Sequence, residues 1–218
     1  MATANDSSRE GHSGAGHDGA GHDGPVHKAR PTRAARLRRL IVSVLDPRAW
    51  LHLLKIVNYY NVTHATPARR LTRGRALNLS PTASLSNPEN IVLGERVRIG
   101  AHSSLWAGPA RGRIVLGDDV VIGPNVMVTA ANYRFNDGSP VNEQAMNEAD
   151  VIVGRDAWIG AGAVLLPGAQ IGDGAIIGAG AIIRRKVAPG AIMVGPPAGP
   201  IGQRRGWDNA TDEPDHDR

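Results

Sequence analysis

A repeat of six residues constrains this 218-residue chain more than any other feature of its sequence. Between residues 93 and 183, an aliphatic residue recurs at every sixth position within four groups of three. An amphipathic helix needs a period of about 3.6 residues, so twelve matches to a period of six exclude it. The twelve positions are Leu93, Ile99, Leu105, Leu116, Ile122, Val128, Val153, Ile159, Leu165, Ile171, Ile177 and Ile183.

A period of six with one inward aliphatic side chain per unit is typical of the short strands of a β-helix. Glycine directly follows the aliphatic residue at eight of the twelve positions, and a small or β-branched residue usually stands four positions after it. We therefore predict an all-β core, a parallel β-helix with four coils of three strands. Because such an array is not stable one strand at a time, its ends need covers. The helical segment at 46–60 and the residues after Pro200 are the expected covers.

Composition supports an aliphatic core and excludes several classes of site. Only 4% of the residues are aromatic, and the chain has no cysteine. A disulfide scaffold, a thiolate nucleophile and a cysteine-ligated zinc site are therefore excluded. No apolar run approaches the roughly 20 residues of a membrane span, and residues 1–24 are too polar for a secretory signal. We expect a cytoplasmic protein.

Charge and composition divide the chain into four parts. Residues 1–31 form a tail rich in His, Gly and Asp, which we expect to be disordered. Four evenly spaced histidines in this tail could gather a metal ion, although a solvated low-complexity tail is the preferred interpretation, and we predict no metal site. Residues 32–78 are a basic helical cap segment, 79–203 the β-helix domain, and 204–218 an acidic tail. The net charge of +5 is uneven, because twelve Lys or Arg and one acid lie between residues 28 and 75.

The helical segment has two interpretations. Asp46 followed by Pro47 is typical of a helix start, and Trp50, Leu53, Leu54 and Val57 then recur at helical spacing. The segment can pack across the end of the β-helix, which we favour. Alternatively, a basic amphipathic helix can lie on an anionic membrane, so a peripheral membrane contact through residues 33–60 stays open. Nucleic acid is not an expected partner, because no base-reading module is present.

The repeat resembles the hexapeptide of left-handed parallel β-helix acyltransferases. The resemblance covers residues 93–201, and its motifs are DAWIGAGAVLLPGAQIGDGAIIGAGAIIRRKV at 156–187, VGPPA at 194–198 and RFNDGSPVNEQ at 134–144. The last is similar to the active-site loop of the sugar and xenobiotic O-acetyltransferase branch, and LWAGPARGRI at 105–114 resembles polysaccharide-modifying members. The resemblance implies a homotrimer, acetyl-CoA as acyl donor in a groove between subunits, and an acceptor hydroxyl deprotonated by a loop histidine.

The spacing independently points to a site at one edge of the predicted prism. The period of six is broken between Leu105 and Leu116 and again between Val128 and Val153. Both breaks follow the third strand of a coil, so we expect both loops to leave the same edge, one coil apart. Four loop carboxylates, Asp137, Glu143, Glu148 and Asp150, are interpreted as mostly solvating. The longer loop is more typical of a functional element than of a tolerated insertion.

The sequence departs from the family at the expected catalytic histidine. The AN-x-R run places that position at Tyr133, and a shift of one residue places it at Asn132, so neither alignment finds a histidine. Tyrosine, with a pKa of about 10, is a poor base at neutral pH. Tyr133 could hold the substrate or relay a proton, His102 could supply the base, or catalysis could rest on positioning alone. A corner histidine facing water is the alternative interpretation of His102.

For acetyl-CoA, the resemblance implies contacts with two groups of residues. Small residues and backbone amides would let the pantetheine arm lie close to the strands, and a cationic cluster would face the nucleotide phosphates. Trp158 could instead pack on a neighbouring strand, and the cationic cluster could be a solvated turn. The residues are Trp158, Gly160, Ala161, Ala179, Arg184, Arg185 and Lys186.

The favoured function is acetyl transfer from acetyl-CoA to a saccharide hydroxyl, in a surface polysaccharide or its precursor. An antibiotic acceptor is the runner-up within the transferases. A non-catalytic trimeric scaffold that lost its base is the alternative of a different class. A metallo-hydratase of the carbonic anhydrase kind would need three converging histidines, and only His102 lies in the repeats.

Overall fold

The computed structural model describes residues 31–207, so the predicted N-terminal tail with its four histidines and residues 208–218 lie outside the described part. The chain divides into two compact units, with the boundary between Ala49 and Trp50. Among the described helices, none combines the length and the apolar character needed to cross a membrane.

Two helices form the basic segment. Helix α1 (Arg33–Leu45) is capped by Thr32, whose hydroxyl accepts a hydrogen bond from the Ala35 N–H. Helix α2 (Pro47–Tyr60) begins where the Asp–Pro pair predicts, and the Asp46 carboxylate accepts a bond of 2.9 Å from the Arg48 N–H. Neither helix buries any of its side chains. The expectation that residues 46–60 cover the end of the β-helix is therefore wrong.

The cover of the first coil comes from the shorter elements that follow. A π-helical turn, η1 (Asn61–Ala65), leads into helix α3 (Thr66–Arg70), which contacts strand β3. Pro67 and Leu71 are buried, and His64 Nδ1 lies 2.8 Å from the carbonyl oxygen of Ala83. The coil is covered here because Pro67 of α3 and Leu71, directly after the helix, are buried, whereas the apolar side chains of α2 stay exposed.

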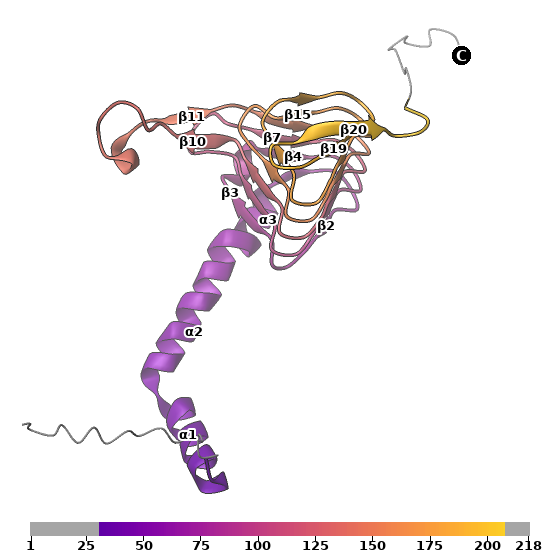
Figure 1. Cartoon of the computed structure of the whole chain (residues 1–218). Helices are drawn as coiled ribbons and strands as arrows, with labels where there is room; N and C mark the ends of the chain where they lie inside the picture. Colours follow the sequence, from indigo (N-terminus) through magenta and orange to yellow (C-terminus); the bar gives the residue numbers. More distant parts are fainter. Residues whose placement is uncertain (1–30, 208–218) are drawn as a thin grey trace, which may run out of the picture. The chain divides into compact units, whose positions relative to one another are not determined.

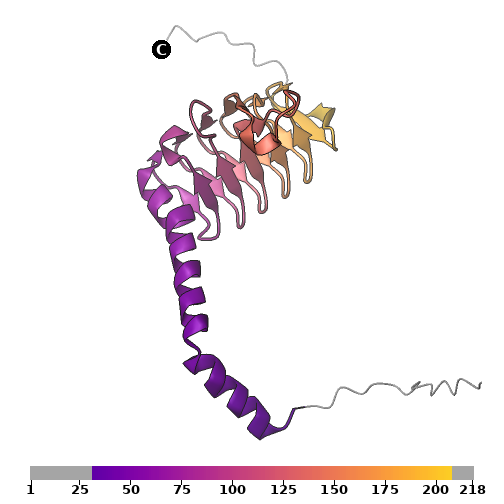
Figure 2. The ribbon, with the colours of Figure 1, turned by 90° about the vertical axis from the view of Figure 1, so that its left-hand side faces the viewer.

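The β-helix has three parallel sheets, here called A, B and C, whose strands stack coil on coil (Figures 1 and 2). Sheet A contains β1 (Thr72–Arg73), β4 (Ile91–Leu93), β7 (Ile114–Leu116), β12 (Val151–Val153), β15 (Gln170–Ile171) and β18 (Lys186–Val187). Sheet B contains β2 (Asn78–Leu79), β5 (Arg98–Ile99), β8 (Val121–Ile122), β13 (Trp158–Ile159), β16 (Ile176–Ile177), β19 (Ala191–Val194) and β20 (Gly199–Gln203). Sheet C contains β3 (Ser84–Ser86), β6 (Ser104–Trp106), β9 (Met127–Thr129), β14 (Val164–Leu165) and β17 (Ile182–Ile183). We call the turns between the sheets corners AB, BC and CA.

The predicted all-β core is confirmed, and the number of coils is larger than predicted. All twelve repeat residues are buried, with at most 3% of their surface exposed. A further coil, β1 to β3, precedes them, and an incomplete one, β18 and β19, follows. The period of six did not predict the first coil because Arg73 stands at the aliphatic position, in register with Leu93. The period did not predict the last, incomplete coil because Val187 follows Ile183 by four residues instead of six.

The C-terminal residues attach to the last coils. Strand β20 pairs antiparallel with β19 and so extends sheet B beyond the last coil. Trp207 lies against Gly174, where an added Cβ would come within 2.2 Å of the indole ring. Arg204 donates a hydrogen bond of 2.8 Å to the Asp156 carboxylate. Among the described residues, the strands of the β-helix therefore extend from β1 (Thr72–Arg73) to β20 (Gly199–Gln203).

Candidate functional site

Three loops leave corner CA one coil above another. The two loops predicted from the broken period occupy residues 107–113 and 130–150. The third, shorter loop contains the 3-10 turn η2 (Pro88–Asn90) and was missed, because it lengthens the spacing by only two residues. Asn87 Nδ2 donates to the Gly108 carbonyl, and Asn90 Nδ2 to the Ala110 carbonyl. The hydrogen bonds confirm that successive loops lie side by side.

The longest loop is built on an antiparallel hairpin. Strands β10 (Ala131–Tyr133) and β11 (Met146–Glu148) pair with each other, and Figure 1 shows the hairpin extending away from the coils. Its tip contains the turn η3 (Val141–Glu143). The Gln144 side chain fastens the tip by donating a hydrogen bond of 2.7 Å to the Ser139 carbonyl. The loop is therefore an ordered platform at corner CA.

Glu148 joins the hairpin to the neighbouring loop. Its carboxylate accepts hydrogen bonds from the backbone N–H groups of Ala110, Arg111 and Gly112, at 3.0, 2.5 and 2.9 Å. The N–H of Arg111, followed by those of Ala110 and Gly112, lowers the pKa of this carboxyl, because these bonds favour the charged form. Asp150 repeats the arrangement with the Arg113 N–H at 2.9 Å. Interpreting these two carboxylates as solvating was wrong.

The hairpin and the shorter loop enclose a polar surface cavity of about 430 Å³. Arg134 Nε donates a hydrogen bond of 2.8 Å to Asn147 Oδ1, which holds one guanidinium at the cavity. The lining is cationic and amidic, with a methionine as its long apolar side chain. The lining residues are Pro109, Ala110, Arg111, Arg134, Met146, Asn147 and Glu148.

Tyr133 and Asn132 lie on the hairpin, next to this cavity. Tyr133 stands opposite Met146, and Asn132 opposite Asn147. Successive side chains of a strand point to opposite faces, so Asn132 shares a face with Asn147, while Tyr133 lies on the other face. Tyr133 is 45% exposed. Both residues are therefore open to an incoming ligand, and no histidine accompanies them on the hairpin.

His102 lies at a different corner. It is exposed in the turn between β5 and β6, at corner BC, with a left-handed backbone (φ +57°), and its N–H donates to Thr82 Oγ1 at 3.0 Å. The hairpin with Tyr133 leaves corner CA. Within one chain, the structure therefore does not bring His102 and Tyr133 together.

The residues predicted to bind acetyl-CoA divide between two corners. Trp158 lies on the outer face of sheet B between Val121 and Ile176, and it is 53% exposed. Gly160, Ala161 and Ala179 lie at corner BC, in the turns after β13 and β16. A Cβ at Gly160 would come within 2.6 Å of the Ala179 backbone nitrogen, so close stacking of the coils already requires this glycine. Trp158 thus has neighbours on both adjacent strands and a free outer surface, so both interpretations of this side chain stay predictions.

The cationic cluster lies at corner CA, with Arg184 and Arg185 between β17 and β18 and Lys186 as the first residue of β18. It lines a cavity of about 330 Å³ together with residues of the last coils, among them Met193 and Pro197. Strand β17 of sheet C separates this cluster from Ala179 at corner BC. One chain therefore carries the two predicted halves of the acetyl-CoA site on opposite edges of sheet C.

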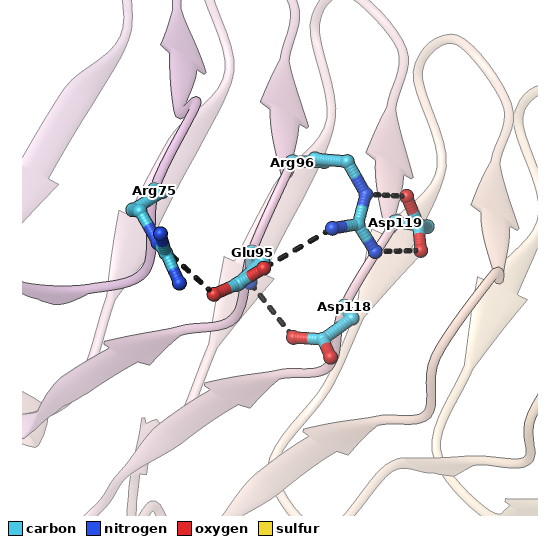
Figure 3. Close-up of polar contacts among 5 residues, drawn as sticks. All are labelled: Arg75, Glu95, Arg96, Asp118 and Asp119. Atoms are coloured by element: carbon cyan, nitrogen blue, oxygen red, sulfur yellow. Dashed lines mark hydrogen bonds and ion pairs between the residues drawn. The ribbon is translucent and has the colours of Figure 1, made fainter.

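Corner AB carries ion pairs instead of loops. Arg96 donates to both oxygens of Asp119 at 2.6 and 2.7 Å and lies 3.1 Å from Glu95, which in turn pairs with Arg75 at 3.6 Å (Figure 3). The hydrogen bond from Arg96 lowers the pKa of Asp119. Asp118 Oδ1 accepts the Glu95 N–H at 2.7 Å. Along residues 31–207, no three His, Cys, Asp or Glu side chains lie close enough to hold a metal ion.

Comparisons with known proteins agree with this architecture. Residues 150–185 match the family model described as bacterial transferase hexapeptide (six repeats), and residues 90–130 match the hexapeptide repeat of succinyl-transferase. Nodulation protein L of Rhizobium meliloti (strain 1021) is 37% identical over 125 residues, which cover 55% of this chain and 67% of that protein.

Solved structures of acyltransferases share the fold. A maltose O-acetyltransferase from Clostridium difficile 630 superposes with a TM-score of 0.58 at 23% identity, covering 70% of this chain and 84% of that one. A galactoside acetyltransferase in complex with coenzyme A gives 0.56 at 26% identity, covering 61% and 64%. AntD, an N-acyltransferase from Bacillus cereus in complex with dTDP and 3-hydroxybutyryl-CoA, gives 0.55 at 22% identity, covering 65% and 87%.

The resemblance inferred from the repeat motifs is thus confirmed by independent matches to both halves of the coil array and by a relative matched over two thirds of its length. On the repeat, the three-sheet β-helix and these matches together, the chain belongs to the hexapeptide-repeat acyltransferase family.

Proposed function

We propose that this protein transfers an acetyl group from acetyl-CoA to a hydroxyl group of a saccharide. The observation that carries the proposal is the loop pair at corner CA, held by Glu148 over a cavity with two arginines. A β-helix that places an ordered polar platform beside its regular coils has a rigid scaffold for positioning an acceptor. Relatives named as maltose and galactoside acetyltransferases support a sugar as the acceptor class.

The residues present fit an acyl-CoA as second substrate. Its phosphates need cationic side chains, which Arg184, Arg185 and Lys186 supply at corner CA. Its pantetheine arm needs a close backbone approach, which the small residues Ala161 and Ala179 allow at corner BC. Acetyl-CoA supplies an acyl group activated as a thioester. The chain has to bind it, orient the acceptor hydroxyl and remove the proton of that hydroxyl as it attacks.

The active unit in this proposal is a homotrimer with a site between each pair of neighbours. Corner CA of one protomer would then face corner BC of the next. That arrangement would complete the acetyl-CoA site from its two separated halves. It would also bring His102 of one protomer toward Tyr133 of another, which the single chain does not do.

Within this trimer, we assign removal of the proton to His102 and orientation of the hydroxyl to Tyr133 and Asn132. A histidine has a pKa near 6.5 and suits a general base at neutral pH, whereas tyrosine does not. A surface polysaccharide or its precursor is the acceptor we would screen first, followed by antibiotics. We place the reaction in the cytoplasm.

Calorimetric titration of the full chain with acetyl-CoA and desulfo-CoA tests the proposal. We expect micromolar binding, weakened about tenfold or more in Arg184→Ala/Lys186→Ala. The matched control Arg75→Ala/Arg98→Ala removes the same charge from other parts of the coils and should bind like the unchanged protein. Absence of binding to a folded trimer would overturn the proposal in favour of a non-catalytic scaffold.

A screen of saccharide acceptors for thiol release from acetyl-CoA then tests the chemistry. The His102→Asn variant should lose nearly all transfer, because no other side chain in this proposal accepts the proton of the acceptor hydroxyl. Full activity of His102→Asn would remove this histidine from the mechanism while leaving the transferase assignment in place.

A further inference from the structure

Helices α1 and α2 each expose a row of large apolar side chains. In α1, Leu37, Leu40 and Ile41 are spaced to share one face, and their exposed fractions are 59, 63 and 49%. In α2, Leu53, Leu54 and Val57 stand at positions i, i+1 and i+4, which also places them on one face, and their exposed fractions are 46, 63 and 57%. Single exposed apolar residues are ordinary, but two successive rows at helical spacing are not.

The cations of the segment are concentrated in α1, which contains Arg33, Arg36, Arg38 and Arg39, whereas α2 contains two, Arg48 and Lys55. Residues 33–60 contain six Lys or Arg and a single acid, Asp46. That carboxylate already accepts the Arg48 N–H at the start of α2. On a helical wheel, Arg36, Arg38 and Arg39 lie outside the Leu37–Leu40–Ile41 face of α1. Helix α1 thus has cations beside its apolar face, and α2 carries its two cations on the side away from Leu53, Leu54 and Val57.

We propose that α1 and α2 bind the surface of an anionic lipid bilayer, lying in the interface plane. Apolar side chains would enter the boundary of the acyl chains, and the cations would meet lipid phosphates. The helices have 13 and 14 residues, or roughly 20 Å each, too short for a hydrocarbon core of about 30 Å. They therefore lie on the membrane and do not cross it.

A second copy of the chain is a poorer occupant of the apolar faces. Packing the helices of several copies together would concentrate six cations per copy with one acid each. Anionic lipid instead neutralises that charge while it buries the same apolar side chains. The inference does not depend on the proposed acyl transfer, since neither helix contributes a residue to corner CA.

Co-sedimentation with vesicles tests the inference on the full chain. Vesicles of phosphatidylcholine with about one third phosphatidylglycerol should bind the protein, and vesicles of phosphatidylcholine alone should bind it roughly tenfold more weakly. Binding should weaken as NaCl is raised, because the electrostatic attraction is screened.

A matched pair of double variants separates the apolar face from added charge. Leu40→Glu/Leu54→Glu places two carboxylates on the apolar faces and should weaken vesicle binding roughly tenfold or more. Val42→Glu/His52→Glu adds the same charge away from those faces and should reduce binding much less. Equal loss in both variants, or no binding by the unchanged protein, would overturn the proposal. A smaller oligomer in the Leu40→Glu/Leu54→Glu variant, measured by sedimentation velocity, would assign the faces to a second copy instead.

Discussion

Corners AB and CA belong to the same coils, and at each the chain passes from one sheet to the next, but it does so differently at the two corners. At corner AB every coil turns in a short, repeating way, with left-handed residues such as Arg96, Asp119 and Asp156 (φ +55°, +59° and +54°). At corner CA the chain leaves the coils three times, through residues 87–90, 107–113 and 130–150. Corner AB thus repeats one short turn, whereas corner CA carries the three loops that interrupt the period.

Both corners nevertheless use one device, a carboxylate that accepts backbone N–H groups of another coil. At corner AB, Asp118 accepts from Glu95, and Asp173 accepts from Arg155 at 2.9 Å. At corner CA, Glu148 accepts from three successive residues of the neighbouring loop. At corner AB the device joins adjacent coils, whereas at corner CA it holds a loop in place beside a cavity. The same chemistry therefore contributes to stability at one corner and to positioning at the other.

The largest loss of stability is expected from a substitution in the aliphatic stack, which fills the coils between the two corners. Ile159 is completely buried, and Ile159→Ala removes aliphatic contacts to the coils on either side. We expect the free energy of unfolding to fall by about 2 to 5 kcal/mol, measured by urea denaturation. The adjacent Trp158 is 53% exposed, and Trp158→Ala should change it by only about 0.5 kcal/mol. A similar loss in both variants would contradict the assignment of inward and outward residues.

The second prediction tests whether Glu148 positions the loop at residues 110–112 for acetyl transfer. Glu148→Gln removes the charge that accepts the N–H groups of residues 110–112, and the loop should exchange its amide hydrogens roughly tenfold faster. Acetyl transfer should fall by about ten- to a hundredfold, because a displaced loop misplaces the acceptor. Glu143→Gln, an exposed glutamate of the same hairpin, is the matched control. Unchanged exchange in Glu148→Gln would remove this carboxylate from loop positioning.

The same contrast explains what the sequence could predict. The aliphatic stack was predicted residue by residue, because each inward position depends only on its place in a period of six. The loops at corner CA were located by the breaks in that period, but Glu148 was not singled out. Its role depends on bringing residue 148 beside residues 110–112, more than 35 positions apart, and no local pattern encodes this contact.

The helical segment was misjudged for a related reason. An apolar face at helical spacing predicts burial but does not name the surface that buries it. Pro67 and Leu71 are buried at the end of the aliphatic stack, and the apolar face of α2, including Leu54, is exposed. The sequence located Tyr133 on the longer loop, and its catalytic role stays a prediction, whereas the position of His102 at another corner required the fold.

Acid should weaken corner CA before it affects the stack. Hydrogen bonds from the N–H groups of residues 110–112 lower the pKa of Glu148 below its ordinary value of 4.5. A lowered folded pKa means that its contribution is complete above the unfolded pKa and is lost as the pH falls through the folded value. The difference in Tm between the unchanged protein and Glu148→Gln should be constant from about pH 7 to pH 5 and shrink below about pH 4.5. Thermal unfolding at each pH measures this difference in Tm. If the difference stays constant down to pH 3, the carboxylate contributes nothing through its charge.

The smallest effect belongs to the ion pairs of corner AB. Arg96 and Asp119 are about half exposed, and pairs of this kind contribute little because solvent and salt screen them. The Arg96→Met variant should lower Tm less than Ile159→Ala does, and the deficit should disappear in about 1 M NaCl, where the screening length is only about 3 Å. Acetyl-CoA binding should not change, because the loops and the cationic cluster lie at other turns of the coils. A loss of binding in Arg96→Met would mean that the two corners are coupled through the stack and are not the separate structural and positioning devices that their geometry indicates.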